Sequence, residues 1–331
     1  AAIAGLCSAG CDVVDLGVAM TPTVGVMVDE LDAAGGMVLT ASHNPQQWNG
    51  LKCLIRERPD IGDGTIAACA PSASDANQIV ARFKAIEQGQ VQPWQPWNNL
   101  GNVREMRNAA RVHVDRVVSR FGEDVIEAII AMKPTVVLDS VNGAGVTAGR
   151  MLLERLGCRV VHLGNDQTGI FPHKPEPTRE NLAGEGGICQ TVTQHGAIVG
   201  FAQDPDADRL AIVDERGNYI GEEYTVVLAA GEVFAMGMAG REKKSQATAV
   251  NLSTSRMIED VAAEFGVRVN RTRVGEANVV EAMKQTTGLS IDDLRVDGGA
   301  SVMEFLLQFQ ANQLGVQVSR PVVTDSTALG A

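Results

Sequence analysis

A serine, a histidine and a lysine stand close together in the run Thr40-Ala-Ser-His-Asn-Pro45, which is followed by Asn49-Gly-Leu-Lys52. The run comes directly after Gly35-Gly-Met-Val-Leu39, an apolar stretch typical of a strand. It is therefore expected in a loop at the carboxyl end of that strand, where α/β sheets place ligands. A serine there is exposed, and the side chains of His43 and Lys52 could both interact with it. An ordinary turn remains the alternative, because Ser, His, Asn and Pro all suit turns or caps.

Three carboxylates alternate in the run Asp204-Pro-Asp206-Ala-Asp208-Arg209. Oxygen donors at this spacing suit Mg²⁺ or Ca²⁺, and unpaired carboxylates so close together would repel one another without a cation. An EF-hand is the competing interpretation, since Glu215 falls at its twelfth position. Against it, Arg209 stands at the sixth position, where the turn needs glycine, and the flanking residues resemble strands rather than helices. A metal loop between two strands is the favoured interpretation.

A third candidate is Gly143-Ala-Gly-Val-Thr-Ala148, which fits the G-x-G-x-x-G/A pattern of dinucleotide sites, with Asp166 about 20 residues further on. However, Asp139-Ser-Val-Asn142 separates the preceding strand from the first glycine, where a dinucleotide-binding turn is tight. Glycines that open a helix, with Asn142 near its cap, are the favoured interpretation. Binding of NAD stays an alternative.

The elements that must position these residues alternate between strands and helices, which predicts an α/β fold with parallel or mixed sheets. Helices are expected at 144–156, closed by Gly157, and at 253–265. The Gln-, Asn-, Pro- and Trp-rich stretch 89–102 marks the end of a first domain. The expected strands are 13–17, 37–41, 135–140, 159–164, 197–202, 210–215, 247–252 and 267–270.

Composition narrows the possible partners. The formal charge of −12 argues against nucleic acid, which is bound through basic surfaces. No run reaches the roughly 18 apolar residues that a membrane helix needs. The six cysteines show no zinc spacing and are expected to be reduced thiols, so we expect a cytoplasmic protein. The opening residues look like the middle of a helix, which predicts that the chain is a fragment. Its oligomeric state is left open.

The order and spacing of several motifs resemble the α-D-phosphohexomutases, the superfamily of phosphoglucomutase, phosphomannomutase and phosphoglucosamine mutase. The resemblance spans about residues 1–283. It rests on T-A-S-H-N-P-x₃-N-G-x-K, on D-P-D-A-D-R and on Arg271-Thr-Arg-Val-Gly-Glu276, with support from Asp139-Ser-Val-Asn-Gly143 and Pro175-Glu-Pro177. The residues around Trp48 and Gly221-Glu-Glu-Tyr224 look most like the phosphoglucosamine or phosphomannomutase type.

The resemblance implies a phosphoserine at Ser42, which would also be a residue of the metal site, with His43 and Lys52 beside it as acid/base groups or phosphate contacts. It implies Mg²⁺ at Asp204, Asp206 and Asp208, and contact between Arg209 and the phosphoryl group. The implied reaction interconverts the 1-phosphate and 6-phosphate of a hexose through a bisphosphate. It requires a protein phosphorylated in advance.

The last fifty or so residues depart from that pattern. After Lys284 we find neither the G-E-x-S-G-H motif nor the R-x-S-G-T motif of the mutases. The run Leu294-Arg-Val-Asp-Gly-Gly-Ala-Ser301 and the residues after it resemble the C-terminal region of glycerol kinase and related sugar kinases. That resemblance implies that Gly298, Gly299 and Ala300 approach ATP phosphates, although an ordinary strand–turn–helix explains them as well.

The expected organisation follows from these two resemblances. Residues 1–105 would be the remnant of a truncated first mutase domain, 106–220 the second domain with the metal loop at its end, and 221–283 part of a third. Residues 284–331 would be a kinase-like fragment, and the final mutase domain would be missing. We therefore expect impaired turnover of the hexose phosphate. A non-catalytic protein that binds metal and phosphate, and an ATP-dependent sugar kinase, are the alternatives.

Overall fold

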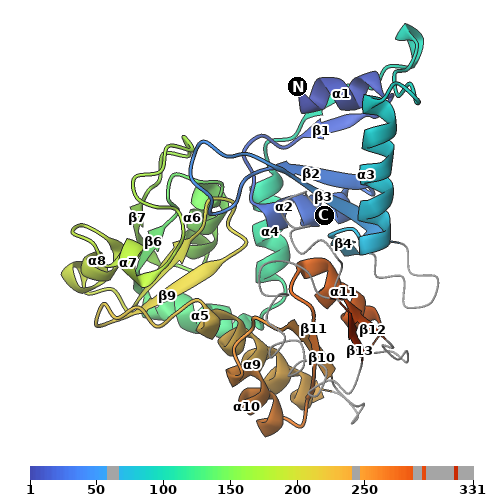
Figure 1. Cartoon of the computed structure of the whole chain (residues 1–331). Helices are drawn as coiled ribbons and strands as arrows, with labels where there is room; N and C mark the ends of the chain where they lie inside the picture. Colours follow the sequence, from blue (N-terminus) through green and yellow to red (C-terminus); the bar gives the residue numbers. More distant parts are fainter. Residues whose placement is uncertain (58–66, 241–246, 286–292, 296–316, 320–331) are drawn as a thin grey trace. The chain divides into compact units, whose positions relative to one another are not determined.

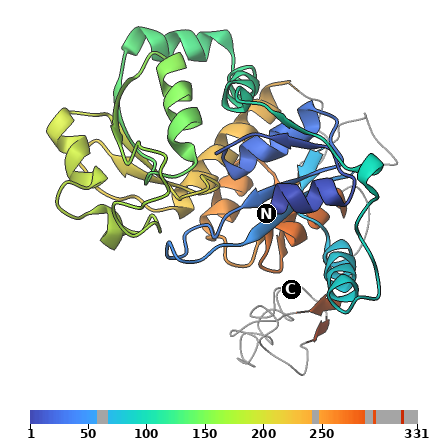
Figure 2. The same cartoon turned by 90° about the horizontal axis from the view of Figure 1, so that it is seen from above.

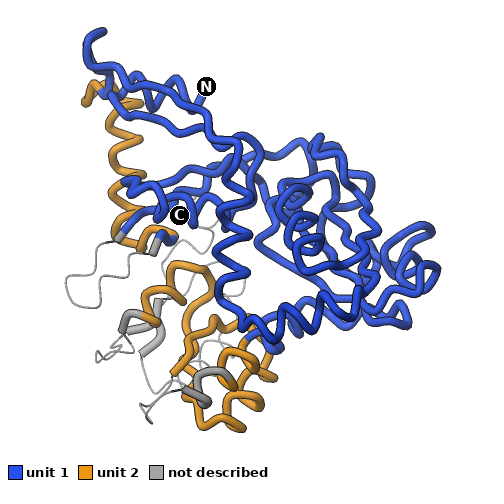
Figure 3. The backbone as a smooth tube through the Cα atoms, turned by 180° about the vertical axis from the view of Figure 1, so that it is seen from behind, with its two compact units in different colours: residues 1–69, 93–229 blue, residues 70–92, 230–331 orange. Residues whose placement is uncertain are grey.

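The chain divides into two compact units, which Figure 3 distinguishes by colour. Unit 1 holds residues 1–69 and 93–229, and unit 2 holds residues 70–92 and 230–331. The computed structural model describes residues 1–57, 67–240, 247–285, 293–295 and 317–319. The expected Gly298-Gly299-Ala300 site lies outside the described residues.

The larger sheet of unit 1 has four strands in the order β7-β6-β8-β9 (Figure 1). Three of them are parallel: β6 (Thr135–Asp139), β7 (Arg159–Leu163) and β8 (Val199–Gln203). The fourth, β9 (Leu210–Asp214), returns antiparallel to β8. The turn between β8 and β9 therefore lies at the carboxyl end of β8. The helices of this region are α5 (Glu123–Met132), α6 (Gly145–Arg155), α7 (Arg179–Leu182) and α8 (Ile188–His195).

Helices cover both faces of this sheet, as Figure 2 also shows. Side chains of a strand alternate between faces. On one face Leu138 packs with Leu153 of α6, and on the other Val137 packs with Ile188 and Val192 of α8. A strand buried on both faces needs a continuous apolar run, and the sequence of β6 supplies one. The α/β fold expected from the sequence is thus confirmed for this region.

A second sheet of unit 1 carries the serine loop. It is antiparallel and contains β2 (Gly35–Leu39), β3 (Leu51–Glu57) and β4 (Ala67–Cys69). Helix α2 (Thr21–Glu30) lies so close to β2 that a Cβ on Gly36 would meet two valine side chains at 2.8 Å. The loop 40–50 joins β2 to β3. The other elements of unit 1 are α1 (Ala2–Ser8), β1 (Val13–Asp15), η1 (Trp97–Asn99), β5 (Val103–Glu105), parallel to β1, and α4 (Ala109–Val118).

Unit 2 contains a parallel pair of strands, β10 (Ala247–Asn251) and β11 (Arg268–Thr272), joined by α10 (Met257–Glu264). Its core includes Phe234 and Ile258. The chain enters this unit along α9 (Glu223–Gly240). The other described elements are α3 (Ala73–Glu87), α11 (Glu276–Gln285), β12 (Asp293–Arg295) and β13 (Gln317–Ser319), the last two paired in parallel.

Arg271 on β11 binds the connection between β10 and α10 through hydrogen bonds. Its Nε and one Nη2 hydrogen donate to the two carboxylate oxygens of Glu259 at 2.6 and 2.8 Å. The remaining donors reach three backbone carbonyls, those of Asn251, Thr254 and Ser255, at 3.2, 2.9 and 3.4 Å. All the hydrogen-bond partners of Arg271 therefore lie within unit 2.

The described residues contain no helix that is both long enough and apolar enough to cross a membrane.

Candidate active site and metal centre

Ser42 lies in the loop between β2 and β3, in a backbone conformation that few residues other than glycine adopt. Its φ is +51°, in the left-handed region. The Ser42 N–H donates to Thr40 Oγ1 at 2.8 Å, and the N–H of Asn44 donates to the carbonyl of Ala41 at 3.1 Å. The Thr-Ala-Ser-His-Asn run is therefore a tight turn, as its composition predicted, and the turn fixes the direction of the serine side chain.

The three aspartates occupy the turn between β8 and β9. One carboxylate oxygen from each lies within 4.8 Å of the others. Asp204 and Asp206 are buried, whereas Asp208 is exposed. Ala207 makes the turn possible with a φ of +54°, and its N–H donates to the carbonyl of Asp204 at 3.0 Å. Strands flank this turn on both sides, which excludes the EF-hand alternative.

The serine loop and the aspartate turn meet within unit 1. Ser42 Oγ donates to Asp204 Oδ2 at 3.0 Å, although 162 residues separate the two in sequence. His43 Nδ1 lies 3.4 Å from the same Oγ. Lys52 Nζ, carried by β3, lies 2.7 Å from Asp206 Oδ2 and 2.7 Å from Asp208 Oδ2. These residues thus form one constellation.

Arg209 also turns toward this constellation. Its Nε donates to Asp204 Oδ2 at 3.3 Å and its backbone N–H donates to Asp204 Oδ1 at 3.1 Å. Its Nη1 lies 3.5 Å from Glu222 Oε1. The seven site residues that the mutase resemblance implied therefore lie around one point.

Sequence reasoning missed two further residues of the site. Thr21, the first residue of α2, donates from Oγ1 to Asp206 Oδ2 at 2.6 Å, and its backbone N–H donates to the Asp206 carbonyl at 3.0 Å. Glu222 pairs with Arg209. The Thr21-Pro22 pair at a helix start was the available signal for the first. Glu222 lies in the run Gly221-Glu-Glu-Tyr224, which resembles the mutases, but that run gave it no role in the site.

The turn after β6 packs against the aspartate turn. The N–H of Ala144 donates to the carbonyl of Pro205 at 2.7 Å. A Cβ on Gly143 would lie 2.4 Å from that carbonyl oxygen, and one on Gly145 would lie 2.2 Å from the Oε1 of Gln203. The glycines of the G-x-G-x-x-A run therefore permit close packing against the aspartate turn.

Burial and charge act differently on the carboxylates. Burial, reinforced by the charges of Asp208 and Asp206, raises the pKa of Asp204 to about 6. Burial would raise the pKa of Asp206 as well, but hydrogen bonds from Lys52 and Thr21 outweigh it and lower that pKa. Burial alone would lower the pKa of Lys52, and its two carboxylate partners raise it instead. The constellation thus holds concentrated negative charge that its cations balance only in part.

The donor set fits a divalent cation such as Mg²⁺. All three side chains offer oxygen ligands, the type that Mg²⁺ binds in proteins. In addition, Asp206 Oδ1 is buried and has no hydrogen-bond partner among the described residues. A buried carboxylate oxygen without a partner is costly, and a bound cation would satisfy it.

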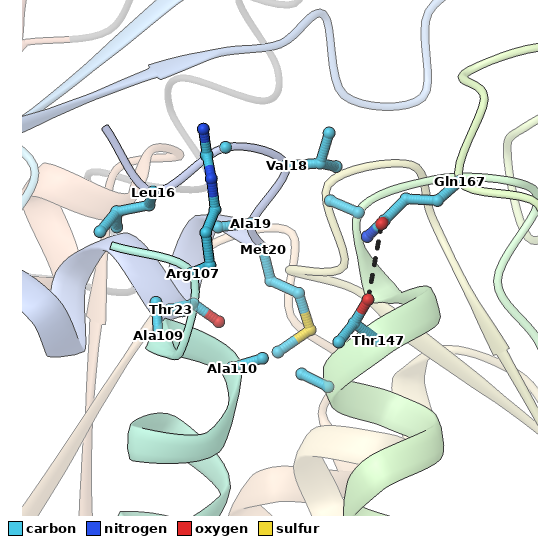
Figure 4. Close-up of a pocket in the computed structure, with 13 residues that line it drawn as sticks. Leu16, Val18, Ala19, Met20, Thr23, Arg107, Ala109, Ala110, Thr147 and Gln167 are labelled. Atoms are coloured by element: carbon cyan, nitrogen blue, oxygen red, sulfur yellow. Dashed lines mark hydrogen bonds between the residues drawn. The ribbon is translucent and has the colours of Figure 1, made fainter. Parts of the chain in front are cut away.

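A small cavity of about 210 Å³ lies elsewhere in unit 1 (Figure 4). It is lined by the loop after β1, the starts of α4 and α6, and Gln167, whose Oε1 lies 3.5 Å from Thr147 Oγ1. Alanine and other apolar side chains make up most of its lining, which also includes Arg107 (Figure 4). The lining includes none of the residues of the constellation.

Models of protein families match four consecutive parts of the chain. Residues 1–80, 112–217 and 222–291 match "alpha/beta/alpha" domains I, II and III of phosphoglucomutase/phosphomannomutase. Residues 273–331 match the C-terminal domain of the FGGY family of carbohydrate kinases. The kinase match overlaps the place where the sequence departs from the mutase pattern.

Two relatives illustrate the similarity in sequence. "Phosphoglucomutase/phosphomannomutase" of Thermococcus kodakarensis is 35% identical over 87% of this chain and 58% of its own length. "Probable phosphoglucosamine mutase" of Methanopyrus kandleri is 32% identical over 86% of this chain and 57% of its own length. The chain thus spans somewhat more than half the length of the relatives it matches.

Solved structures agree on the fold. A phosphoglucomutase/phosphomannomutase family protein of Burkholderia thailandensis superimposes with a TM-score of 0.59 at 24% identity, covering 86% of this chain and 56% of the other. Parafusin, a phosphoglucomutase of Paramecium, gives 0.56 at 16% identity, covering 82% of this chain and 52% of the other.

Proposed function

Since residues 1–291 of this chain belong to the phosphoglucomutase/phosphomannomutase family of α-D-phosphohexomutases, we propose that the chain transfers a phosphoryl group to and from hexose phosphates through Ser42. The proposal includes a phosphoserine at that residue and Mg²⁺ at Asp204, Asp206 and Asp208. The substrate would be a hexose 1-phosphate or 6-phosphate, as the names of the relatives suggest, and the enzyme would act in the cytoplasm.

The observation that carries the proposal is the contact between Ser42 Oγ and Asp204 Oδ2, 3.0 Å apart across 162 residues of sequence. A hydroxyl directed at a carboxylate cluster is a poor site for an anion unless cations are present. Lys52 and Arg209 already supply two positive charges there. A phosphoryl group on Ser42 would face these two cations and the carboxylates that would hold the metal.

The main role of the protein in this reaction is to neutralise the negative charge on the transferring phosphoryl group. During transfer, the bond between Ser42 Oγ and phosphorus breaks and a sugar hydroxyl oxygen bonds to phosphorus. The sugar hydroxyl proton passes to a base, and the released Ser42 Oγ takes up a proton. His43 Nδ1, 3.4 Å from Ser42 Oγ, is placed to give Ser42 that proton. Lys52 and Arg209 stabilise negative charge on the transferring group. A bound divalent cation would supply further neutralisation of that group.

Phosphorylation of Ser42 tests the proposal directly. The chain is incubated with Mg²⁺ and glucose 1,6-bisphosphate, and its intact mass is measured. We expect a gain of one phosphoryl group, located by peptide mapping at Ser42 and absent from Ser42→Ala. The control is Ser119→Ala, which removes an exposed hydroxyl that donates to the carbonyl of Arg116. No phosphoryl gain, or gain at another residue, would refute the proposal.

One observation favours a second candidate, a protein that accepts phosphate on Ser42 but isomerises little sugar. The constellation supplies a nucleophile and cations, yet residues 273–331 match the C-terminal domain of the FGGY family of carbohydrate kinases, and the residues after Lys284 carry neither of the two mutase motifs. A coupled assay for conversion of the 1-phosphate to the 6-phosphate, with glucose, mannose and glucosamine phosphates in parallel, separates the two candidates and identifies the preferred sugar.

A further inference from the structure

Lys52 holds two of the three aspartates together. Its Nζ lies 2.7 Å from Asp206 Oδ2 and 2.7 Å from Asp208 Oδ2, across 154 and 156 residues of sequence. The Lys52 side chain is 35% exposed, whereas that of Asp206 is 4% exposed. Among the described residues, Lys52 is the cation that pairs with Asp208. The ammonium group therefore stands on the solvent side of the cluster, bridging two carboxylates.

An ammonium group in this position and a divalent cation would share the same two carboxylates, with Asp206 Oδ1, which has no hydrogen-bond partner among the described residues, left for the metal. The Oδ2 of Asp206 already accepts from Lys52 and from Thr21 Oγ1, at 2.7 and 2.6 Å. Each carboxylate oxygen has about two lone pairs, so these two donors use the capacity of Oδ2. A cation that binds Asp206 and Asp208 side by side would place its charge within a few ångströms of Nζ, where like charges repel strongly.

We propose that the Lys52 ammonium group competes with the metal for the carboxylates of Asp206 and Asp208. This inference rests on the proposed function, because it takes the aspartates to be the metal ligands. Binding of Mg²⁺ displaces Nζ from at least one carboxylate. The β2–β3 pairing places Lys52 opposite Val38, at the base of the loop that carries Ser42, so the released ammonium group stays beside the serine.

Two consequences follow for the protein's own behaviour. The lysine lowers the affinity for Mg²⁺, since the metal must replace a partner that is already bound. The lysine also stabilises the carboxylate cluster without metal, because it offsets the mutual repulsion of the aspartates. Removing its charge should therefore move metal affinity and metal-free stability in opposite directions.

The test compares Mg²⁺ binding to the full chain and to Lys52→Met, which keeps an unbranched side chain and removes the charge. Isothermal titration calorimetry should give a dissociation constant at least about tenfold lower for the variant, because one like charge near the metal is gone. In EDTA the variant should melt at a lower temperature, and Mg²⁺ should raise that temperature by more than it does for the unmodified chain. Lys174→Met, which removes an exposed lysine elsewhere in unit 1, should change neither quantity.

Equal or weaker Mg²⁺ binding by Lys52→Met would overturn the inference. If that variant does not fold, as judged by circular dichroism, Lys52→Gln repeats the test with a polar side chain, and Lys52→Arg should retain the weaker affinity. If the unmodified chain itself binds no Mg²⁺, the proposed metal site fails, and the inference falls with it. If Ser42 accepts phosphate and the unmodified chain binds Mg²⁺, but removing Lys52 does not tighten binding, the inference alone is wrong.

Discussion

Replacing Gly143 with alanine puts a methyl group where the backbone of Pro205 lies. The new Cβ would be 2.4 Å from the Pro205 carbonyl oxygen, 2.8 Å from its Cα and 3.0 Å from its carbonyl carbon. Gly143 is not among the residues with positive φ, so the added contact is the whole cause of the effect. Ordinary van der Waals contact begins at 3.4 Å, so the two backbones must separate by about 1 Å.

The magnitude follows from two losses. Overpacking of a closely packed site costs about 1–3 kcal/mol. The hydrogen bond from Ala144 to Pro205, 2.7 Å long, weakens as the backbones separate, which costs about 0.5–1.5 kcal/mol more. Because Pro205 stands between Asp204 and Asp206, its movement also changes the spacing of two proposed metal ligands. Changes to residues that support metal ligands typically lower metal affinity about 10–100-fold.

Thermal melting in EDTA and calorimetric titration with Mg²⁺ measure the two effects separately. Gly184→Ala is the matched control, since a Cβ there meets no heavy atom within 4 Å and the φ is not in the left-handed region. It should change the stability by no more than about 0.5 kcal/mol. A Gly143→Ala protein that melts and binds Mg²⁺ like Gly184→Ala would refute the claim that this turn supports the aspartates.

Three further predictions concern the metal, pH and turnover. Mg²⁺ at a hundredfold excess over its dissociation constant should stabilise the chain by about 2.7 kcal/mol. If Mg²⁺ raises the melting temperature of Asp206→Ala by the same amount, the site is elsewhere. The hydrogen bond from His173 to Asp139, 2.9 Å long, is the largest influence on the pKa of His173 and raises it above 6.5 against the effect of burial. The stability that His173 adds relative to His173→Gln should therefore be full below pH 6.5 and disappear as the pH rises through the raised pKa. A difference in melting temperature that grows with pH would contradict this sign. Residues 273–331 match a kinase domain, and the residues after Lys284 carry neither of the two mutase motifs. The chain should therefore isomerise hexose phosphate far more slowly than the usual range of roughly 1–1000 per second, since positioning can supply about 7–11 kcal/mol of a barrier. A coupled assay with turnover in that range would show the prediction to be wrong.

Much of the fold could be predicted from local sequence. The mainly apolar runs of β6, β8 and β9 predict strands because burial on a sheet requires apolar residues. The helix expected at 253–265 begins only at Met257. The side chain of Asn251 accepts hydrogen bonds from the N–H groups of Ser253 and Thr254, which holds those residues in a turn ahead of the helix.

The site was predictable only in part. Ser42 and Asp204 each lie in a distinctive local motif, but their meeting followed from the family resemblance and not from any periodicity. Thr21 reaches Asp206 across 185 residues, and its own sequence neighbourhood shows only a helix start. Glu222 lies in a run that resembles the mutases, but its pairing with Arg209 could not be predicted from that run. Contacts between distant segments depend on how sheets and helices pack, and local sequence patterns do not predict them.

Arg271 belongs to a family motif, yet all of its N–H donors already have partners within the protein. A guanidinium group has five N–H donors, and the Glu259 carboxylate and three backbone carbonyls use all five within unit 2. An anionic ligand could be bound by this arginine only by taking a donor away from one of those partners. Lysine, with three donors, would leave at least two of the five acceptors unserved. The position therefore requires the guanidinium shape as well as a positive charge, and a change that keeps the charge alone would loosen the connection between β10 and α10.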